Sequence, residues 1–202
     1  ALNPANGFDT VVVFVSTQDS YSISSPGISI DTGVTIISRK ALMGSDNGNG
    51  GDTLPTVAWG GGSGVMFTVD SGARFEGFAV NGVDSSSGFK VVQVNASGAS
   101  PNRAVFTNIT VRNAGYGVHA GSNANNLEIT SCTALNLSRS AVEFSGASAR
   151  IEKCYAENIA DSVISQSGGS GATIIDNVIR NANTGMMLNG GGNAVLRNKI
   201  FN

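Results

Sequence analysis

The chain has 202 residues, of which 13% are charged, and its net charge at pH 7 is −2. This length corresponds to one domain or one segment of a repeat structure. So small a net charge argues against nucleic acid as a main partner, and no apolar run is long enough to insert into a membrane. The 27 glycines, together with many Ser, Thr and Asn residues, indicate frequent turns and a surface of hydroxyl and amide groups.

The first half of the chain alternates strand-like stretches with irregular ones. We expect residues 1–20 to lead into or cap the first coil, with one strand in FDTVVVFVST, and residues 21–202 to form the repeat structure. Residues 21–40 alternate apolar and polar side chains as strands do. Residues 41–55 and 82–103 are expected to be excursions from the repeat. Asp46, Asn49 and Asp52 in the first excursion could offer oxygen ligands to Ca²⁺, but a plain glycine-rich loop is the preferred interpretation.

From Ala104 to Asn202 one motif occurs five times, as FTNITVRN, ITSCTALN, IEKCYAEN, IIDNVIRN and VLRNKIFN. The motifs end in asparagines spaced by 23, 22, 23 and 21 residues: Asn113, Asn136, Asn158, Asn181 and Asn202. A period of this length, without any helical pattern, predicts a solenoid in which the strands of successive coils stack in parallel. The expected fold is all-β, a single-stranded parallel β-helix with about 22 residues per coil and regular coils over 104–202.

Stacked coils place equivalent residues in columns. Asparagine tolerates left-handed backbone angles at bends, and stacked amides can bond each other, so the five asparagines should form a ladder. The step of three residues from Phe106 to Ile109 predicts a bend within each motif. Cys132 and Cys154 fall one repeat apart in the column of Ile109 and Asn177. Two stacked buried thiols are expected there; a disulfide is the alternative, although in-register strands hold their Cβ atoms farther apart than a disulfide prefers.

The pattern N-x-I-x-N, followed by a turn with glycine and a short apolar strand, occurs in NVIRNANTGMML and begins again in NKIFN. This pattern resembles that of the right-handed parallel β-helix proteins of the pectate-lyase-like superfamily, and GVTIISRK and ITVRNAGYGVHAG look like the family's early coils. The resemblance covers nearly the whole chain and implies a right-handed β-helix. It does not fix the function, because the family includes lyases, hydrolases, epimerases, phage fibres and surface proteins.

The second strand of each coil carries one group of candidate catalytic residues. Because alternate residues of a strand face opposite sides, His119 and Glu143 should point outward one coil apart, with Tyr116 beside them as a binding candidate. Lys90 could lie one coil earlier on the same face. A Lys, a His and a Glu within reach of each other could perform general acid–base catalysis on a sugar. The alternative is that all are solvated surface residues.

Three further polar residues, Arg112, Glu157 and Arg180, each directly precede a ladder asparagine. The two arginines are binding candidates, and Glu157 and Arg180 could form a surface ion pair of small energetic value. Trp59 lies in PTVAWG, which has the pattern of a coil strand, so a core position is favoured over a sugar-stacking role.

The catalytic motifs that the resemblance would imply are missing. There is no Asp-Pro-His-Glu motif as in the uronan epimerases, no paired-aspartate motif as in the polygalacturonase-like hydrolases, and no carboxylate cluster as in the pectate lyases. We therefore favour a secreted or cell-surface β-solenoid with a structural or adhesive role, which binds glycans and requires no cofactor. A polysaccharide lyase or glycoside hydrolase is the alternative. The fifth motif has no polar cap after it, so we expect either a continuation in a longer protein or self-association through the terminal coils.

Overall fold

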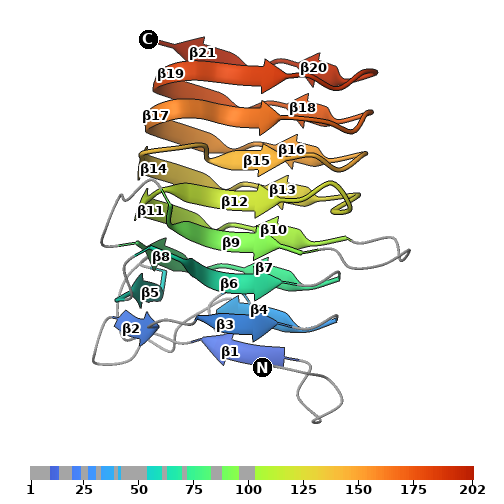
Figure 1. Ribbon diagram of the computed structural model, residues 1–202. Coiled ribbons are helices and arrows are strands. Elements are labelled where there is room, and N and C mark those ends of the chain that lie inside the picture. The colour runs from blue at the N-terminus through green and yellow to red at the C-terminus, as the bar shows by residue number, and fades with distance from the viewer. Residues whose placement is uncertain are drawn as a thin grey trace.

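The computed structural model describes residues 10–13, 20–23, 27–30, 33–38, 41, 54–60, 63–69, 72–82, 88–95 and 103–202. These residues form a β-solenoid in which coils are stacked from the N-terminus to the C-terminus (Figure 1). Every strand pairing within it is parallel. The predicted fold class is confirmed.

The strands form one sheet of eight strands and one of thirteen. The two arms of the larger sheet, which β17 joins, lie on different faces of the solenoid and are called the second and third sheets here. The first sheet contains β1 (Thr10–Val13), β4 (Thr35–Ser38), β7 (Arg74–Glu76), β10 (Val105–Thr107), β13 (Glu128–Thr130), β16 (Arg150–Glu152), β18 (Thr173–Ile175) and β20 (Ala194–Leu196). The second contains β2 (Ser20–Ile23), β5 (Thr56–Trp59), β8 (Ala79–Asn81), β11 (Thr110–Ala114), β14 (Thr133–Leu137) and β21 (Lys199–Phe201). The third contains β3 (Ile28–Ile30), β6 (Val65–Val69), β9 (Lys90–Val94), β12 (Tyr116–Ala120) and β15 (Val142–Phe144). The long strands β17 (Tyr155–Gln166) and β19 (Val178–Leu188) run through both the second and the third sheet.

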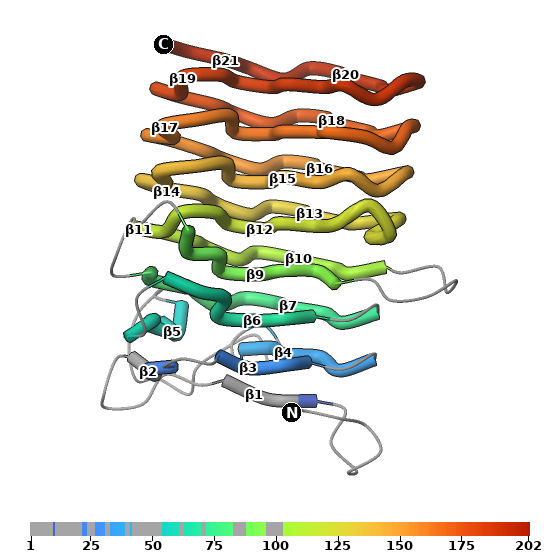
Figure 2. The backbone as a smooth tube through the Cα atoms, viewed as in Figure 1, coloured from blue at the N-terminus to red at the C-terminus, as the bar shows by residue number. Residues whose placement is uncertain are grey.

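The register of the first sheet gives the coil length. Phe106 pairs with Ile129, which pairs with Ile151, then Ile174 and Val195, in steps of 23, 22, 23 and 21 residues. The prediction of about 22 residues per coil is therefore confirmed, and the tube in Figure 2 shows the successive coils bending at the same corners. In the early coils the steps are longer. The predicted excursion at 41–55 lies mostly outside the described residues, and the one at 82–103 is wrong in part, because β9 within it pairs in parallel with β6 and β12. Strand β1 pairs in parallel with β4, so the stack already begins within the segment 1–20.

The core is a continuous column of apolar side chains between the three sheets. In the early coils it is aromatic: Phe75 stacks on Phe106 with ring centroids 5.2 Å apart, and Trp59 stacks on Phe89 at 5.3 Å. Trp59 is only 2% exposed, which confirms the predicted core position. In the later coils the same columns hold aliphatic residues such as Ile151. The core holds the three outer sheet faces in fixed register.

The asparagine ladder forms at the corner between the second and third sheets. Asn113, Asn136, Asn158 and Asn181 all have left-handed backbone angles, with φ between 47° and 57°. Their amides bond from coil to coil, from Asn181 to Asn158 at 2.6 Å, Asn158 to Asn136 at 2.9 Å and Asn136 to Asn113 at 3.5 Å. The ladder extends one coil earlier than predicted, because Asn113 donates to Asn81 at 2.9 Å. Asn202, within the described part of the chain, makes no such bond.

A second column of bends lies between the first and second sheets, where the step from Phe106 to Ile109 predicted one. The residues there have φ between 52° and 56°: Asn108, Ser131, Lys153, Asp176 and Arg197. Their backbone N–H groups still donate to the next coil, for example from Asn108 to the carbonyl of Thr130 at 3.0 Å. The bend therefore turns the chain without interrupting the coil-to-coil hydrogen bonds.

Candidate functional site

Five polar side chains from three successive coils meet on the outer face of the third sheet, and we call them the His119 patch: Lys90, Gln93, Tyr116, His119 and Glu143. Strand pairing sets their order, since Lys90 lies opposite Tyr116 and Gln93 opposite His119. His119 in turn lies opposite Glu143 on the next coil. The structure thus brings together the Lys, His, Glu and Tyr that the sequence singled out, and adds Gln93.

Direct contacts tie the members of the patch to each other. The rings of Tyr116 and His119 meet edge to face, with centroids 5.7 Å apart and planes at 78°. His119 Nε2 lies 3.6 Å from Glu143 Oε1, and the two side chains are 28% and 31% exposed. Lys90 Nζ donates to Gln93 Oε1 at 3.4 Å. Every member therefore remains partly open to solvent while being held by a neighbour.

The electrostatics of the patch favour the neutral form of His119. Burial lowers its pKa, the nearby charge of Lys90 lowers it further, and Glu143 acts in the opposite direction. His119 Nδ1 is buried and has no hydrogen-bond partner. The tautomer that suits this environment carries its proton on Nε2, which is the nitrogen facing Glu143.

The patch resembles a binding face more than a hydrolytic centre. Glycoside hydrolysis ordinarily uses two carboxyl groups on either side of the scissile bond, and Glu143 is the only carboxylate among the five residues. An aromatic ring beside a carboxylate, an amide and an ammonium group is suited to the apolar and hydroxyl surfaces of a sugar. Neither His119 nor Glu143 lines the groove on the first sheet or the cavity inside the solenoid.

The other predicted group lies on a different face. Arg112, Glu157 and Arg180 share one outward column of the second sheet, with Leu135 between Arg112 and Glu157. Arg112 and Arg180 are three coil steps, about 14 Å, apart. Tyr116, the third predicted binding residue, lies on the third sheet, so one small ligand cannot contact all three residues. The Tyr155 hydroxyl donates to Glu157 at 2.7 Å. Arg180 lies over the ring of Phe201, 5.1 Å from its centroid, and the expected Glu157–Arg180 ion pair does not form.

A shallow groove on the outer face of the first sheet was missed from the sequence. Its lining consists of Thr35, Gly72, Arg74, Arg103, Val105, Thr107, Glu128 and Thr130. Among these residues Arg103 pairs with Glu128, and Arg74 pairs with Glu76 beside the groove. Part of this groove could have been predicted, because the alternation in VFT and EIT places Thr107 and Thr130 outward on adjacent coils. Arg103 could not be placed, because it precedes its strand.

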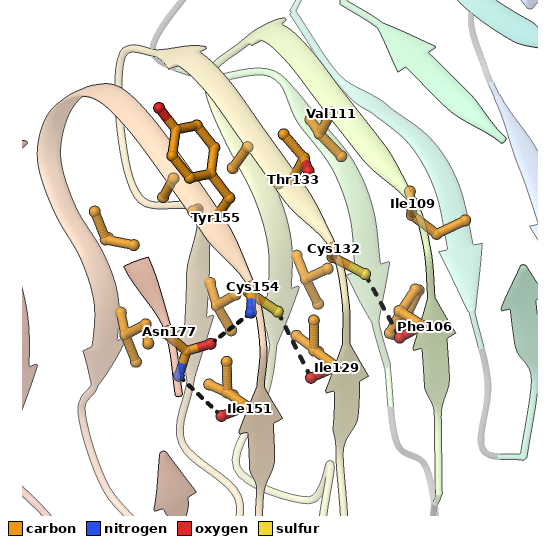
Figure 3. A pocket seen from close by; sticks show the side chains of 18 of the residues that line it. Phe106, Ile109, Val111, Ile129, Cys132, Thr133, Ile151, Cys154, Tyr155 and Asn177 are labelled. Atoms are coloured by element: carbon orange, nitrogen blue, oxygen red, sulfur yellow. Dashed lines mark hydrogen bonds between the residues drawn. The ribbon is translucent and has the colours of Figure 1, made fainter. Parts of the chain in front are cut away.

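The two cysteines occupy the column that the repeat assigns to them. Both are free thiols and half-buried. Cys132 Sγ donates to the carbonyl of Phe106 at 3.5 Å, and Cys154 Sγ lies 3.7 Å from the carbonyl of Ile129. The neighbouring Cys154 thiol and burial both raise the pKa of Cys132. Figure 3 shows both sulfurs turned the same way on neighbouring coils, with Asn177 beside Cys154.

These thiols border a small apolar cavity of about 60 Å³ inside the solenoid. Its lining includes the small residues Gly117, Ala134, Ala141 and Ala156. The cavity exists because these positions carry Gly and Ala, whereas the core of the early coils contains large aromatic side chains.

Among the described residues no three His, Cys, Asp or Glu side chains gather as they would around a metal ion. The weak calcium candidates Asp46, Asn49 and Asp52 lie outside the described residues. In the part of the chain with described structure, no helix is long and apolar enough to span a membrane.

Comparison with known proteins bears on the fold alone. A family model described as the right handed beta helix region matches residues 55–201. No curated protein matches the chain.

Proposed function

The chain belongs to the right-handed β-helix family, and we propose that it is a secreted or cell-surface β-solenoid with a structural and adhesive role, which holds glycans on the outer face of its third sheet. The family accommodates both binding proteins and enzymes, so the role must be argued from the side chains.

The observation that carries this proposal is the composition and shape of the His119 patch. In-register pairing fixes Tyr116, His119 and Glu143 on an outer sheet face, where the strands hold them rigidly. A rigid aromatic ring loses little conformational entropy on binding, and adjacent polar groups supply directed hydrogen bonds. A neutral His119 beside one carboxylate favours hydroxyl groups over a strongly anionic partner.

The test is a binding measurement against neutral and acidic oligosaccharides, with two matched pairs of variants. Tyr116→Ala and Glu143→Gln remove patch groups, while Tyr155→Ala and Glu157→Gln make the same changes on the second sheet. We expect the first pair to abolish glycan binding and the second pair to leave it intact. Equal effects of both pairs, or no binding by the unaltered chain, would refute the proposed site.

A catalytic role is the second candidate. It is favoured by one observation: the charges of Lys90 and Glu143 both act on the imidazole of His119 and shift its pKa in opposite directions. A neutral His119 could remove the C5 proton of a uronic acid residue while the bond from C4 to the linking oxygen breaks, with the charged Lys90 donating a proton to that oxygen; this elimination cleaves the chain. Incubation with acidic polysaccharides tests this, since cleavage creates a double bond that absorbs in the ultraviolet. Turnover that His119→Gln abolishes, with the fold intact, would replace the adhesive proposal.

We also propose that the last coil packs against a further coil, either the continuation of a longer chain or a coil of a second copy. On the last coil Val195 and Ile200 are 45% and 53% exposed, although their register partners Ile174 and Ile179 on the preceding coil are buried. Parallel strands with apolar inward columns stack readily on another such coil.

A further inference from the structure

The two thiols are related to each other by one coil step. Cys132 Sγ contacts the carbonyl of Phe106, Cys154 Sγ contacts the carbonyl of Ile129, and these two carbonyl residues are themselves register partners. Each thiol also contacts the carbonyl two residues before it, Thr130 at 3.5 Å and Glu152 at 3.3 Å. Because the surroundings repeat, the two sulfurs are separated by about the strand spacing, roughly 4.8 Å.

A separation of this size is too long for a disulfide but matches the distance between two sulfurs that bind one metal ion. A disulfide requires Cβ atoms about 3.8 Å apart and bonded sulfurs about 2.05 Å apart, so the coils would have to move together. Two sulfurs on opposite sides of one ion lie at twice the metal–sulfur bond length. With a bond of about 2.3 Å, as in zinc thiolates, this distance is about 4.6 Å.

The surroundings limit the site to two ligands. Along the column, Ile109 precedes Cys132 and Asn177 follows Cys154. The Asn177 amide is already engaged: its oxygen accepts from the Cys154 N–H at 2.9 Å, and its nitrogen donates to the carbonyl of Ile151 at 3.0 Å. The nearby cavity is mostly apolar (Figure 3), and its polar lining residues apart from the thiols, Thr133, Tyr155 and Asn177, carry hydroxyl or amide groups, which are poor ligands for a soft cation.

We propose that Cys132 and Cys154 form a two-coordinate binding site for one soft monovalent cation of the Cu(I) type. Thiolate sulfur selects soft ions, and Cu(I) is the biological example that accepts so few ligands. Zn²⁺ requires about four ligands in a structural site, which this column cannot supply. The proton of each thiol that ionises on binding passes to solvent.

The site does not depend on glycan binding. It lies at the corner between the first and second sheets, whereas the His119 patch is on the third sheet. The cation would join two neighbouring coils in the regular part of the solenoid without distorting their spacing.

The experiment uses the full chain, reduced and free of oxygen, titrated with Cu(I) in competition with a coloured Cu(I) chelator. We expect one Cu(I) per chain and an X-ray absorption spectrum with two sulfur neighbours. Since loss of an outer-shell partner alone costs about 10–100-fold in metal affinity, Cys132→Ser and Cys154→Ser should each weaken binding by at least about 100-fold. Circular dichroism of both variants checks that the β-sheet persists.

A second arm uses the unaltered chain and stays informative if a variant fails to fold. Zn²⁺ in excess should not displace Cu(I), because it finds only two ligands. The proposal is overturned if Zn²⁺ competes equally, if the copper has three or four ligands, if a single-cysteine variant binds as tightly as the parent, or if Cu(I) does not bind. Ready loss of two hydrogens on mild oxidation, detected by mass, would also overturn it, because it would mean that the coils close to form a disulfide.

Discussion

His119 Nε2 faces Glu143 Oε1 at 3.6 Å across one coil step, while Lys90 approaches the same imidazole from the preceding coil. Burial and Lys90 lower the pKa of His119, and Glu143 raises it. Lys90→Gln should therefore raise the pKa of His119, and Glu143→Gln should lower it further. Because the chain contains a single histidine, a proton NMR titration of its ring signals measures both shifts without ambiguity. Shifts in the same direction for both variants would contradict this arrangement of charges.

The same imidazole predicts a pH dependence of stability. In the unfolded chain His119 takes up its proton near the ordinary value of 6.5, whereas the folded state holds a lower pKa. More protons are thus bound by the unfolded state below that pH, so the free energy of unfolding should fall as the pH drops below 6.5. Denaturant unfolding between pH 5 and 8 checks this, and His119→Gln, which cannot titrate, should flatten this part of the curve.

The asparagine ladder allows backbone conformation and side-chain bonding to be separated. Asn136 has φ of 56° and lies between Asn113 and Asn158 in the ladder. Asn136→Gly keeps the left-handed angle but loses the amide bonds, while Asn136→Ala loses both. We expect a loss of about 1 kcal/mol for the glycine variant and about 1–2 kcal/mol more for alanine. Denaturant unfolding measures both.

Asn202→Ala is the matched control for the ladder. Asn202 was predicted to be a ladder member, but it makes none of the coil-to-coil amide bonds in the described structure, so its replacement should leave the free energy of unfolding unchanged. An equal loss at Asn202 and Asn136 would show that the bonds do not account for the effect.

The regular coils were predictable because the same physical demands recur in each one. Phe106, Ile129, Ile151 and Ile174 fill one inward column, and each is followed by a bend that needs a left-handed angle. A repeated demand of this kind leaves a repeated sequence pattern, from which the sheet order, the coil length and the thiol column all follow.

The remaining features depend on loop lengths that the sequence pattern does not determine. Asn81 joins the ladder although it lies 32 residues before Asn113. It could not be predicted, because the extra residues between the two asparagines hide the period of the repeat. For the same reason, the pairing of Gln93 with His119 could not be assigned. The groove by Arg103 depends on side chains of unequal length on neighbouring coils, which no single motif reveals.

Filling the internal cavity should stabilise the protein. Ala134 lines the cavity of about 60 Å³ and faces inward, in register with Val111 and Ala156. At about 24 cal/mol per Å³ the void costs at most about 1.4 kcal/mol, so Ala134→Val should recover up to about 1 kcal/mol. The control is Ala172→Val at a buried site outside the cavity, where overpacking should cost about 1–3 kcal/mol. Similar changes at both sites would argue against a cavity beside Ala134.

End-to-end association should depend on the apolar surface of the last coil. Ile200 pairs with the buried Ile179 in an inward column, yet it is 53% exposed. If copies of this chain stack through that coil, the mass measured by light scattering should rise with concentration, and Ile200→Lys should hold the chain as a monomer by placing a charge in the contact. Met187→Lys is the control, because Met187 is similarly exposed but lies in the third-sheet part of β19, in register with Ser165. Growth that Met187→Lys stops and Ile200→Lys does not would place the contact on the side of the solenoid instead of its end.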